Sequence, residues 1–386
     1  MSEILKAFVG AEIFDGVTRR SQHALMLQGA DIVEVMPKAD IPPDAEVIKL
    51  KGGLICPGFV DLQVNGGGGV MFNDDQSVAA LRTIARAHAR LGATSILPTL
   101  ITDTPERTRR SIDAVEAAVT QGVAGIIGLH LEGPHLSATR KGAHAAALIR
   151  PMEAADLALL LEAAARLPML KVTVAPENVT TGQISDLHEA GVLVSLGHSD
   201  ASFADCEVAA KAGARCVTHL FNAMSQLGSR APGLVGSALT NGALHAGLIA
   251  DGVHVHPASV RAALAAKQGP GHLFLVSDAM AVAGTDLGEF HLNGRRIARK
   301  DGRLTLEDGT LAGADLDLRT AVRNLVKWGA ATEDEALAMA TSIPGSLCGH
   351  AGAFGHLTPG ARADFLHFPA GKDGTMAIWQ AGQPVA

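Results

Sequence analysis

Polar side chains with metal-ligand chemistry stand where long apolar runs of this sequence end. Glu132 closes the run IIGLHLE, His198 stands near the end of VLVSLGHS, and His219 lies within CVTHLFN. One carboxylate and two imidazoles suit a single divalent ion, with zinc as the first expectation and iron, manganese or cobalt as alternatives. A polar group at the end of a buried run costs free energy unless it has a partner, so each could instead be a satisfied structural group. Three ligand-type residues in equivalent positions favour the metal site.

A further acid follows the last of the apolar runs. Asp278 stands in LFLVSDAM. A buried aspartate can simply cap the following loop. Beside a metal-activated water it can instead accept the water proton and pass it to a leaving amine, which makes Asp278 the candidate catalytic acid and base.

The apolar runs that carry these residues alternate with helical patterns. Continuous apolar runs of this length are typical of strands that are buried on both faces of a parallel sheet. There are eight: LICPGFVDLQV, TSILPTL, IIGLHLE, KVTVAPE, VLVSLGHS, CVTHLFN, HAGLIAD and LFLVSDA. In the segment between the first two, one helical face would hold Val78, Leu81, Ile84, Ala85, His88 and Leu91. Eight strands alternating with helices predict an α/β fold, a (β/α)8 TIM barrel whose strand ends converge on one mouth.

The two ends of the chain differ from this middle part. Both show short alternating segments punctuated by Gly, Pro and Asp, which are typical of β-structure. We therefore predict a small β-sandwich domain built from residues 1–52 and 355–386, and a barrel domain over residues 53–354.

The composition of the chain argues against some classes of binding partner. A net charge of -7 argues against nucleic acid and anionic membranes as default partners, although one local arginine can still hold one phosphate. We find no basic segment followed by an apolar stretch at the start of the sequence, and no apolar segment long enough to span a membrane. None of the four cysteines lies in a C-x-x-C pair, which favours buried free thiols and a cytoplasmic location.

An ordered series of motifs carries a family resemblance. The segments PGFVDLQVNG, HLEGPHLSATRKGAH, SLGHSDA, VTHLFNAM, RAPGLVG, IADGVHVHP and LVSDAM follow one another from about residue 52 to 350. Together they resemble the N-acetylglucosamine-6-phosphate deacetylases of the amidohydrolase superfamily. HLEGP and THLFNAM are the most specific of them, and the flanking ends resemble the small β-sandwich of that family.

The resemblance implies a role for individual positions. It implies that Glu132, His198 and His219 hold one metal ion and that Asp278 is the catalytic acid and base. His144 in KGAH matches the residue that contacts the substrate carbonyl. The resemblance also implies substrate contacts for Asn222, Ala223, Arg230 and His254. Arg230 and His254 match a phosphate clamp that reaches in from the neighbouring subunit of a homodimer, so a homodimer with a shared active site is expected.

One position departs from the wider superfamily. Most amidohydrolases carry H-x-H at the end of the first barrel strand, where it ligates a second metal. Here Gln63 and Asn65 close that strand. A neutral amide is a poor ligand for a transition metal, but it can contact a water on the metal, which is the role we predict for Gln63. The substitution predicts one metal ion per subunit.

These expectations combine into one reaction. We expect hydrolysis of N-acetyl-D-glucosamine 6-phosphate to D-glucosamine 6-phosphate and acetate, in amino-sugar catabolism or cell-wall sugar recycling. The galactosamine epimer and an N-acyl amino acid are alternative substrates, and the sequence does not separate the sugar epimers. A non-catalytic barrel that serves as a binding module is disfavoured, because the metal ligands and Asp278 are all retained.

Overall fold

The core of the structure is a barrel of eight parallel strands. The computed structural model describes residues 4–349, 352–371 and 375–385. The barrel strands follow one another in chain order: β8 (Phe59–Val64), β11 (Ala93–Ile101), β12 (Leu129–Glu132), β13 (Leu170–Val174), β14 (Leu193–Leu196), β15 (Cys216–Val217), β16 (His245–Leu248) and β17 (Leu273–Leu275). A parallel bridge between Val64 and Ala279 links the chain after β17 to β8 and closes the barrel. The predicted (β/α)8 fold is confirmed.

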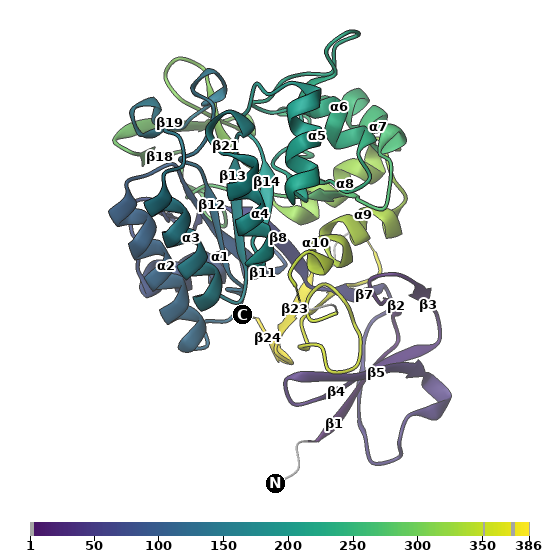
Figure 1. Ribbon diagram of the computed structural model, residues 1–386. Helices are drawn as coiled ribbons and strands as arrows, with labels where there is room; N and C mark the ends of the chain where they lie inside the picture. Colours follow the sequence, from purple (N-terminus) through teal and green to yellow (C-terminus); the bar gives the residue numbers. More distant parts are fainter. Residues whose placement is uncertain (1–3, 350–351, 372–374, 386) are drawn as a thin grey trace.

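Helices alternate with these strands and surround them (Figure 1). They are α1 (Val78–Arg90), α2 (Pro105–Thr120), α3 (Ala154–Arg166), α4 (Thr181–Glu189), α5 (Phe203–Ala212), α6 (Gly233–Thr240), α7 (Pro257–Ala266) and α8 (Leu318–Lys327), followed by α9 (Glu333–Ala340) and α10 (Ser342–Ser346). In α1, Ser77 caps the N-terminus by accepting from the Ala80 amide. The predicted apolar face of α1 is confirmed, because Leu81, Ile84 and Ala85 are buried.

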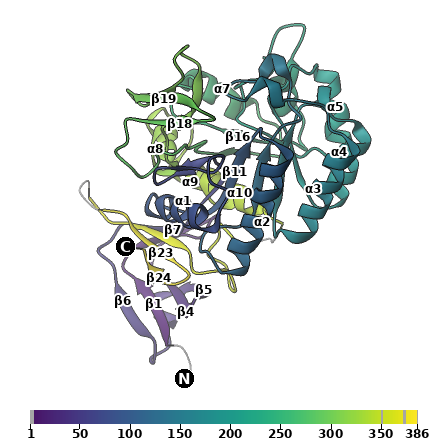
Figure 2. The ribbon, with the colours of Figure 1, turned by 90° about the vertical axis from the view of Figure 1, so that its left-hand side faces the viewer.

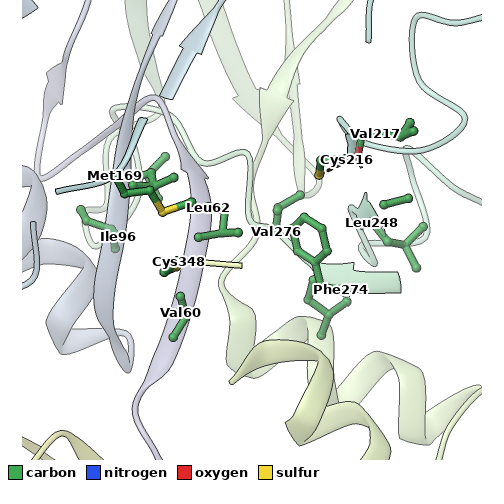
Figure 3. Packing of buried hydrophobic residues seen from close by; sticks show 14 of the residues in the cluster. Val60, Leu62, Ile96, Met169, Cys216, Val217, Leu248, Phe274, Val276 and Cys348 are labelled. Carbon is green, nitrogen blue, oxygen red and sulfur yellow. Dashed lines mark hydrogen bonds between the residues drawn. The ribbon is translucent and has the colours of Figure 1, made fainter. Parts of the chain in front are cut away.

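The barrel strands are largely apolar because they are buried on both faces. Every residue of β8, β11 and β13 is buried. Figure 3 shows part of this core, with Val60 and Leu62 from β8 and Phe274 from β17. The four cysteines are buried and free, as predicted. No helix in the described part of the chain is both long and apolar enough to cross a membrane.

Both ends of the chain build two further sheets beside the barrel (Figures 1 and 2). The first sheet has the order β5-β4-β1-β6 and the second the order β24-β23-β22-β7-β2-β3. Their bounds are β1 (Leu5–Val9), β2 (Glu12–Phe14), β3 (Arg19–Arg20), β4 (His23–Gln28), β5 (Asp31–Pro37), β6 (Glu46–Lys49), β7 (Leu54–Pro57), β22 (Phe365–Phe368), β23 (Ala377–Gln380) and β24 (Gln383–Pro384). Phe8 packs edge-on against Phe365, with 5.0 Å between ring centroids, so residues from both ends share one core. The boundaries at residues 52 and 355 stay a prediction.

The first apolar run is divided between two sheets, whereas we expected one strand. β7 pairs with β2 and β22, and β8 enters the barrel. Gly58 separates them at a tight crossing, because a Cβ atom there would lie 2.0 Å from Thr94 Oγ1. No side chain larger than glycine fits at this junction without a shift of the neighbouring strand.

An antiparallel sheet between β17 and α8 was not predicted. It consists of β18 (Glu289–Leu292), β19 (Arg295–Lys300), β20 (Arg303–Thr305) and β21 (Leu311–Ala314). This sheet lies on the side of the barrel where the strands have their carboxyl ends (Figure 1). A short hairpin of β9 (Gly66–Gly67) and β10 (Val70–Met71) follows β8. Single turns of 3-10 helix are found at Lys38–Asp40, Ala138–Arg140, Ala146–Leu148 and Pro176–Asn178.

Candidate metal centre and active site

The candidate ligands stand at the carboxyl ends of barrel strands. Glu132 is the last residue of β12, His198 comes two residues after β14, and His219 two residues after β15. The backbone of His198 has φ +46° and that of His219 has φ +31°. A residue with a positive φ cannot continue a strand, so the backbone turns where these side chains are needed. Strained backbone of this kind clusters at functional sites.

The three side chains converge on one point. His219 Nε2 lies 3.0 Å from Glu132 Oε1, His198 Nε2 lies 3.2 Å from the same oxygen, and the two Nε2 atoms are 3.1 Å apart. All three residues are buried. Burial raises the pKa of the Glu132 carboxyl, but hydrogen bonds with His198 and His219 outweigh it and hold that pKa well below its usual range. The site therefore presents an ionised carboxylate between two imidazoles.

This arrangement fits a divalent metal ion. The ligand atoms all lie within 4.8 Å of one another. Ligands about 2.1 Å from a tetrahedral ion are separated from each other by about 3.4 Å, which is close to the separations found here. The His198 ring is oriented by its other nitrogen, because Nδ1 lies 2.8 Å from the Arg140 carbonyl oxygen and donates to it. Nε2 then faces Glu132 and is the nitrogen that would bind the metal, the usual arrangement around metal-binding histidines.

Asp278 lies beside this cluster, held by two amides. Its Oδ1 accepts from Asn65 Nδ2 at 2.7 Å and from Gln63 Nε2 at 3.1 Å. Gln63 Nε2 is also 3.2 Å from each oxygen of Glu132, so Gln63 links the two acids. Burial, and then the charge of Glu132, raises the pKa of Asp278 above its ordinary value. The arrangement leaves Oδ2 of Asp278 available to take up a proton.

Asn65 was noted in the sequence only as a residue that closes the first strand. In the structure it is buried, and its Oδ1 has no hydrogen-bond partner among the described residues. Asn65 also lines the cavity described below. Its position two residues after Gln63, and therefore on the same side of the strand end, is the signal that could have identified it.

His144 approaches the cluster from the loop after β12. Its Nε2 lies 4.0 Å from Glu132 Oε2, and its Nδ1 is 2.7 Å from Thr102 Oγ1. The backbone N–H of Thr102 donates to Nδ1 at 3.3 Å, so Nδ1 carries no proton and the proton sits on Nε2. Burial, followed by His198, lowers the pKa of His144 well below its ordinary value. His144 is thus a neutral donor that faces the cluster.

A cavity of about 370 Å³ opens over these residues at the barrel mouth. Glu132, His198, His219, Asp278 and His144 line it. Three of the predicted substrate contacts line it as well: Asn222, Ala223 and His254. The unpredicted sheet β18–β21 contributes Leu292, Leu311 and Gly313 to the lining. The loop after β12 contributes Thr139, Arg140, Gly142 and Ala143. All the predicted site residues except Gln63 and Arg230 therefore line one cavity, and Gln63 is hydrogen-bonded to two of its acids, Glu132 and Asp278.

Arg230 is the residue that lies elsewhere. It is exposed in the loop between β15 and α6, and no ion pair to it is found in the part of the chain that the structure describes. This loop projects beyond the helices near α6 (Figure 1). One chain alone does not bring the Arg230 guanidinium to its own cavity.

Two further histidines have structural positions. His135 is buried, and its Nδ1 contacts the Arg150 carbonyl oxygen at 3.1 Å. His256 is exposed and caps the N-terminus of α7 by accepting from the Ala258 amide.

Comparison with known proteins agrees with this site. The model of the amidohydrolase family matches residues 54–380. An N-acetylgalactosamine-6-phosphate deacetylase of Shewanella sp. (strain ANA-3) is 40% identical over 350 residues, which cover 89% of this chain and 86% of the relative. An N-acetylglucosamine-6-phosphate deacetylase of Haemophilus influenzae is 34% identical over 348 residues, covering 89% of this chain and 90% of the relative.

A solved structure resembles this one along nearly its whole length. The crystal structure of N-acetylglucosamine-6-phosphate deacetylase from Pasteurella multocida superimposes with a TM-score of 0.93 at 34% identity, and the match covers 99% of both chains. The matched family model, these relatives and the ligand cluster at the strand ends agree: the protein belongs to the amidohydrolase family.

Proposed function

We propose that this protein is a metal-dependent deacetylase that hydrolyses N-acetyl-D-glucosamine 6-phosphate to D-glucosamine 6-phosphate and acetate. The observation that carries the proposal is the meeting of Glu132, His198 and His219 with Asp278 and His144 in one cavity. The names of the similar proteins support the choice of an amino-sugar phosphate as substrate. The four buried free thiols support a cytoplasmic location.

Glu132, His198 and His219 would hold one divalent ion, for which zinc is our first choice and iron, manganese or cobalt are alternatives. When bound, the metal lowers the pKa of a water molecule and polarises the substrate carbonyl. Gln63 stands at a position where binding of a second metal ion would require a histidine. Its amide instead donates hydrogen bonds to Glu132 and Asp278. These contacts support one metal ion per subunit.

Asp278 would carry out the proton transfers, and His144 would stabilise the negative charge that develops on the carbonyl oxygen. Asp278 accepts the proton of the attacking water on Oδ2, because Oδ1 is occupied by Asn65 and Gln63. It then returns that proton to the sugar nitrogen as the C–N bond breaks, so that the nitrogen leaves as a neutral amine. His144 donates its Nε2–H to the carbonyl oxygen, a hydrogen bond that strengthens as negative charge develops there.

The phosphate would lie at the other end of the cavity. We assign it to His254, Asn222 and Ala223 of one chain and to Arg230 of a second copy of the chain. The exposure of Arg230 and of Leu227, which is 59% exposed in the same projecting loop, supports a homodimer in which this loop reaches its neighbour. Arginine offers the paired donors that a phosphate accepts.

Replacing Arg230 by alanine should raise KM for N-acetylglucosamine 6-phosphate by about 10- to 100-fold, the loss expected for charge-assisted hydrogen bonds. KM for unphosphorylated N-acetylglucosamine should stay within twofold. The exposed Arg110→Ala on α2 is the matched control, and it should change neither value. An equal rise for both sugars would remove Arg230 from the phosphate site.

Replacing Asn65 by alanine should lower kcat by about 10- to 100-fold, the range seen when a group that orients an active-site residue is lost. The reason is that Asp278 loses its shortest hydrogen bond, 2.7 Å from Asn65 Nδ2. Bound metal, measured by atomic absorption, should remain at the wild-type level. A kcat within twofold of wild type would show that Gln63 alone is sufficient to hold Asp278.

A second substrate is favoured by one observation. The Shewanella relative at 40% identity is an N-acetylgalactosamine-6-phosphate deacetylase. The test is acetate release by zinc-loaded protein from both sugar 6-phosphates, from unphosphorylated N-acetylglucosamine and from an N-acetyl amino acid. Faster release from the glucosamine phosphate supports our proposal, and faster release from the galactosamine phosphate replaces it with that epimer. Cleavage of the amino acid alone would refute both.

A further inference from the structure

A buried carboxylate–imidazole pair lies at the edge of the cavity, and one of its members, Asp251, has no part in the reaction described above. Asp251 and His254 lie in the loop between β16 and α7. The carboxylate Oδ2 of Asp251 is 2.6 Å from His254 Nδ1, and the side chains are only 6% and 8% exposed. His254 lines the cavity that holds Asp278 and His144. A hydrogen bond between side chains this well shielded from water is not a surface contact of negligible effect.

The backbone fixes the Asp251 carboxylate in place. Its Oδ1 accepts from the backbone amides of Val253 and His254, each at 2.8 Å. Burial raises the pKa of Asp251, but its hydrogen bonds with His254 and these amides outweigh it, so the pKa is lowered overall. An ionised carboxylate has no proton to give, and therefore His254 Nδ1 must be the donor. The ring then presents Nε2 as its free nitrogen.

The ring proton assigned to His254 lies on the opposite nitrogen from the ring proton of His144. The backbone amide of Thr102 donates to His144 Nδ1, which places the proton of that neutral ring on Nε2. The carboxylate of Asp251 places a proton of His254 on Nδ1 instead. One cavity thus holds two imidazoles whose ring protons are fixed on opposite nitrogens.

We propose that Asp251 is a positioning residue that fixes a proton on His254 Nδ1, so that in the substrate complex the ring lies between two anions, Asp251 and the 6-phosphate, and donates a charge-assisted hydrogen bond to the phosphate from Nε2. The inference rests on the proposed function for the identity of the anion. It extends that function by assigning a role to Asp251, which touches neither the metal ligands nor the reacting atoms but acts through His254.

The decisive variant is Asp251→Asn. An asparagine oxygen can still accept from the two backbone amides, while its NH2 group comes to face His254 Nδ1. The ring then turns to the neutral form protonated on Nε2, as expected when an amide replaces the carboxylate partner of a histidine. A neutral donor binds phosphate more weakly than a charged one, and we expect a loss of about tenfold.

Three measurements on the zinc-loaded protein test this. The ring nitrogen shifts of His254 in 15N NMR should report a protonated Nδ1 in the wild type and its loss in Asp251→Asn. The Kd for inorganic phosphate and the KM for N-acetylglucosamine 6-phosphate should each rise about tenfold. Values of kcat and of KM for unphosphorylated N-acetylglucosamine should change less than twofold. The exposed Asp286→Asn should leave all of these unchanged.

A double variant separates this role from a general loss of structure. If Asp251 acts only through His254, then adding Asp251→Asn to His254→Ala should not weaken phosphate binding further, because the two residues work as a unit. Additive losses, an unchanged phosphate Kd, or a wild-type His254 without a proton on Nδ1 would each overturn the inference. A fall in kcat for both sugars would also overturn it, since the pair would then serve proton transfer.

A failure of the inference about Asp251 can be distinguished from a failure of the proposed function. Phosphate binding and the NMR shifts need no turnover, so they can support the role of Asp251 in a protein that releases no acetate. If Asp251→Asn does not fold, the wild-type NMR spectrum and the phosphate Kd of His254→Ala still decide the matter. His254→Ala should then weaken phosphate binding by at least about tenfold.

Discussion

Replacing Asp278 by asparagine should lower kcat for acetate release by about 10³- to 10⁴-fold, the upper range for the loss of a general acid and base. Asparagine has nearly the same shape, and its oxygen can still accept from Asn65, which lies 2.7 Å from Oδ1 in the structure. It cannot accept the proton of water, nor deliver one to the leaving nitrogen. Bound metal and KM should change little, because Asp278 is not one of the three clustered ligands.

Single-turnover measurement of acetate separates this chemical step from product release. Asp286→Asn is again the control, since this residue is exposed outside the cavity. If the Asp278→Asn enzyme kept its turnover within tenfold of wild type, the proton transfers would have to be assigned to another group.

Replacing His219 by alanine should abolish both activity and metal-dependent stabilisation. His219 Nε2 is 3.0 Å from Glu132 Oε1 and 3.1 Å from His198 Nε2, so its loss opens the ligand cluster. A metal present at about 1,000 times its Kd stabilises the native state by about 4 kcal/mol. The wild type should therefore show a higher Tm with zinc than after chelation, and the variant should show no such difference.

His188→Ala provides a matched control for this experiment. His188 is exposed in the last turn of α4, away from the cavity lining, and its replacement should leave the zinc-dependent rise in Tm intact. Retention of both zinc-dependent stability and deacetylation by His219→Ala would show that the metal is held elsewhere.

The three metal ligands could be predicted because each of them interrupts a run of apolar residues. Glu132, His198 and His219 are polar residues at the ends of apolar runs, and the barrel brings such ends together whatever the details of packing. The same reasoning found Asp278. The number of strands followed from the alternation of apolar runs with helical periodicity, since burial on both faces leaves little freedom in strand composition.

Partners of these residues were harder to predict, because they depend on register and on loop paths. Thr102 meets His144 from 42 positions away, and the Arg140 carbonyl meets His198 from 58 positions away. No periodicity encodes such contacts. Asp251 is a different case, since it lies three residues before His254 and both stand in one short loop. A local carboxylate–imidazole pair of this spacing can be considered from the sequence alone.

The sheet β18–β21 was missed although its turns are marked in the sequence. Asn293-Gly294 and Asp301-Gly302 form the two-residue connections of its hairpins, with a positive φ at all four residues. Such pairs are strong hairpin signals. The strands of this sheet are short and alternate buried with more exposed residues, so they lack the continuous apolar runs by which the barrel strands were identified. Arg230 could be assigned only from the family resemblance, because its proposed partner is in a second chain.

The most direct test of the metal-dependent mechanism is a titration of metal-free protein with zinc, in which acetate release from N-acetylglucosamine 6-phosphate is measured at each step. Our account predicts no release without metal and a linear rise that reaches its plateau at one zinc ion per chain. A plateau at two ions would contradict the single site implied by Gln63. Full activity in the thoroughly chelated protein would contradict the role of Glu132, His198 and His219 altogether.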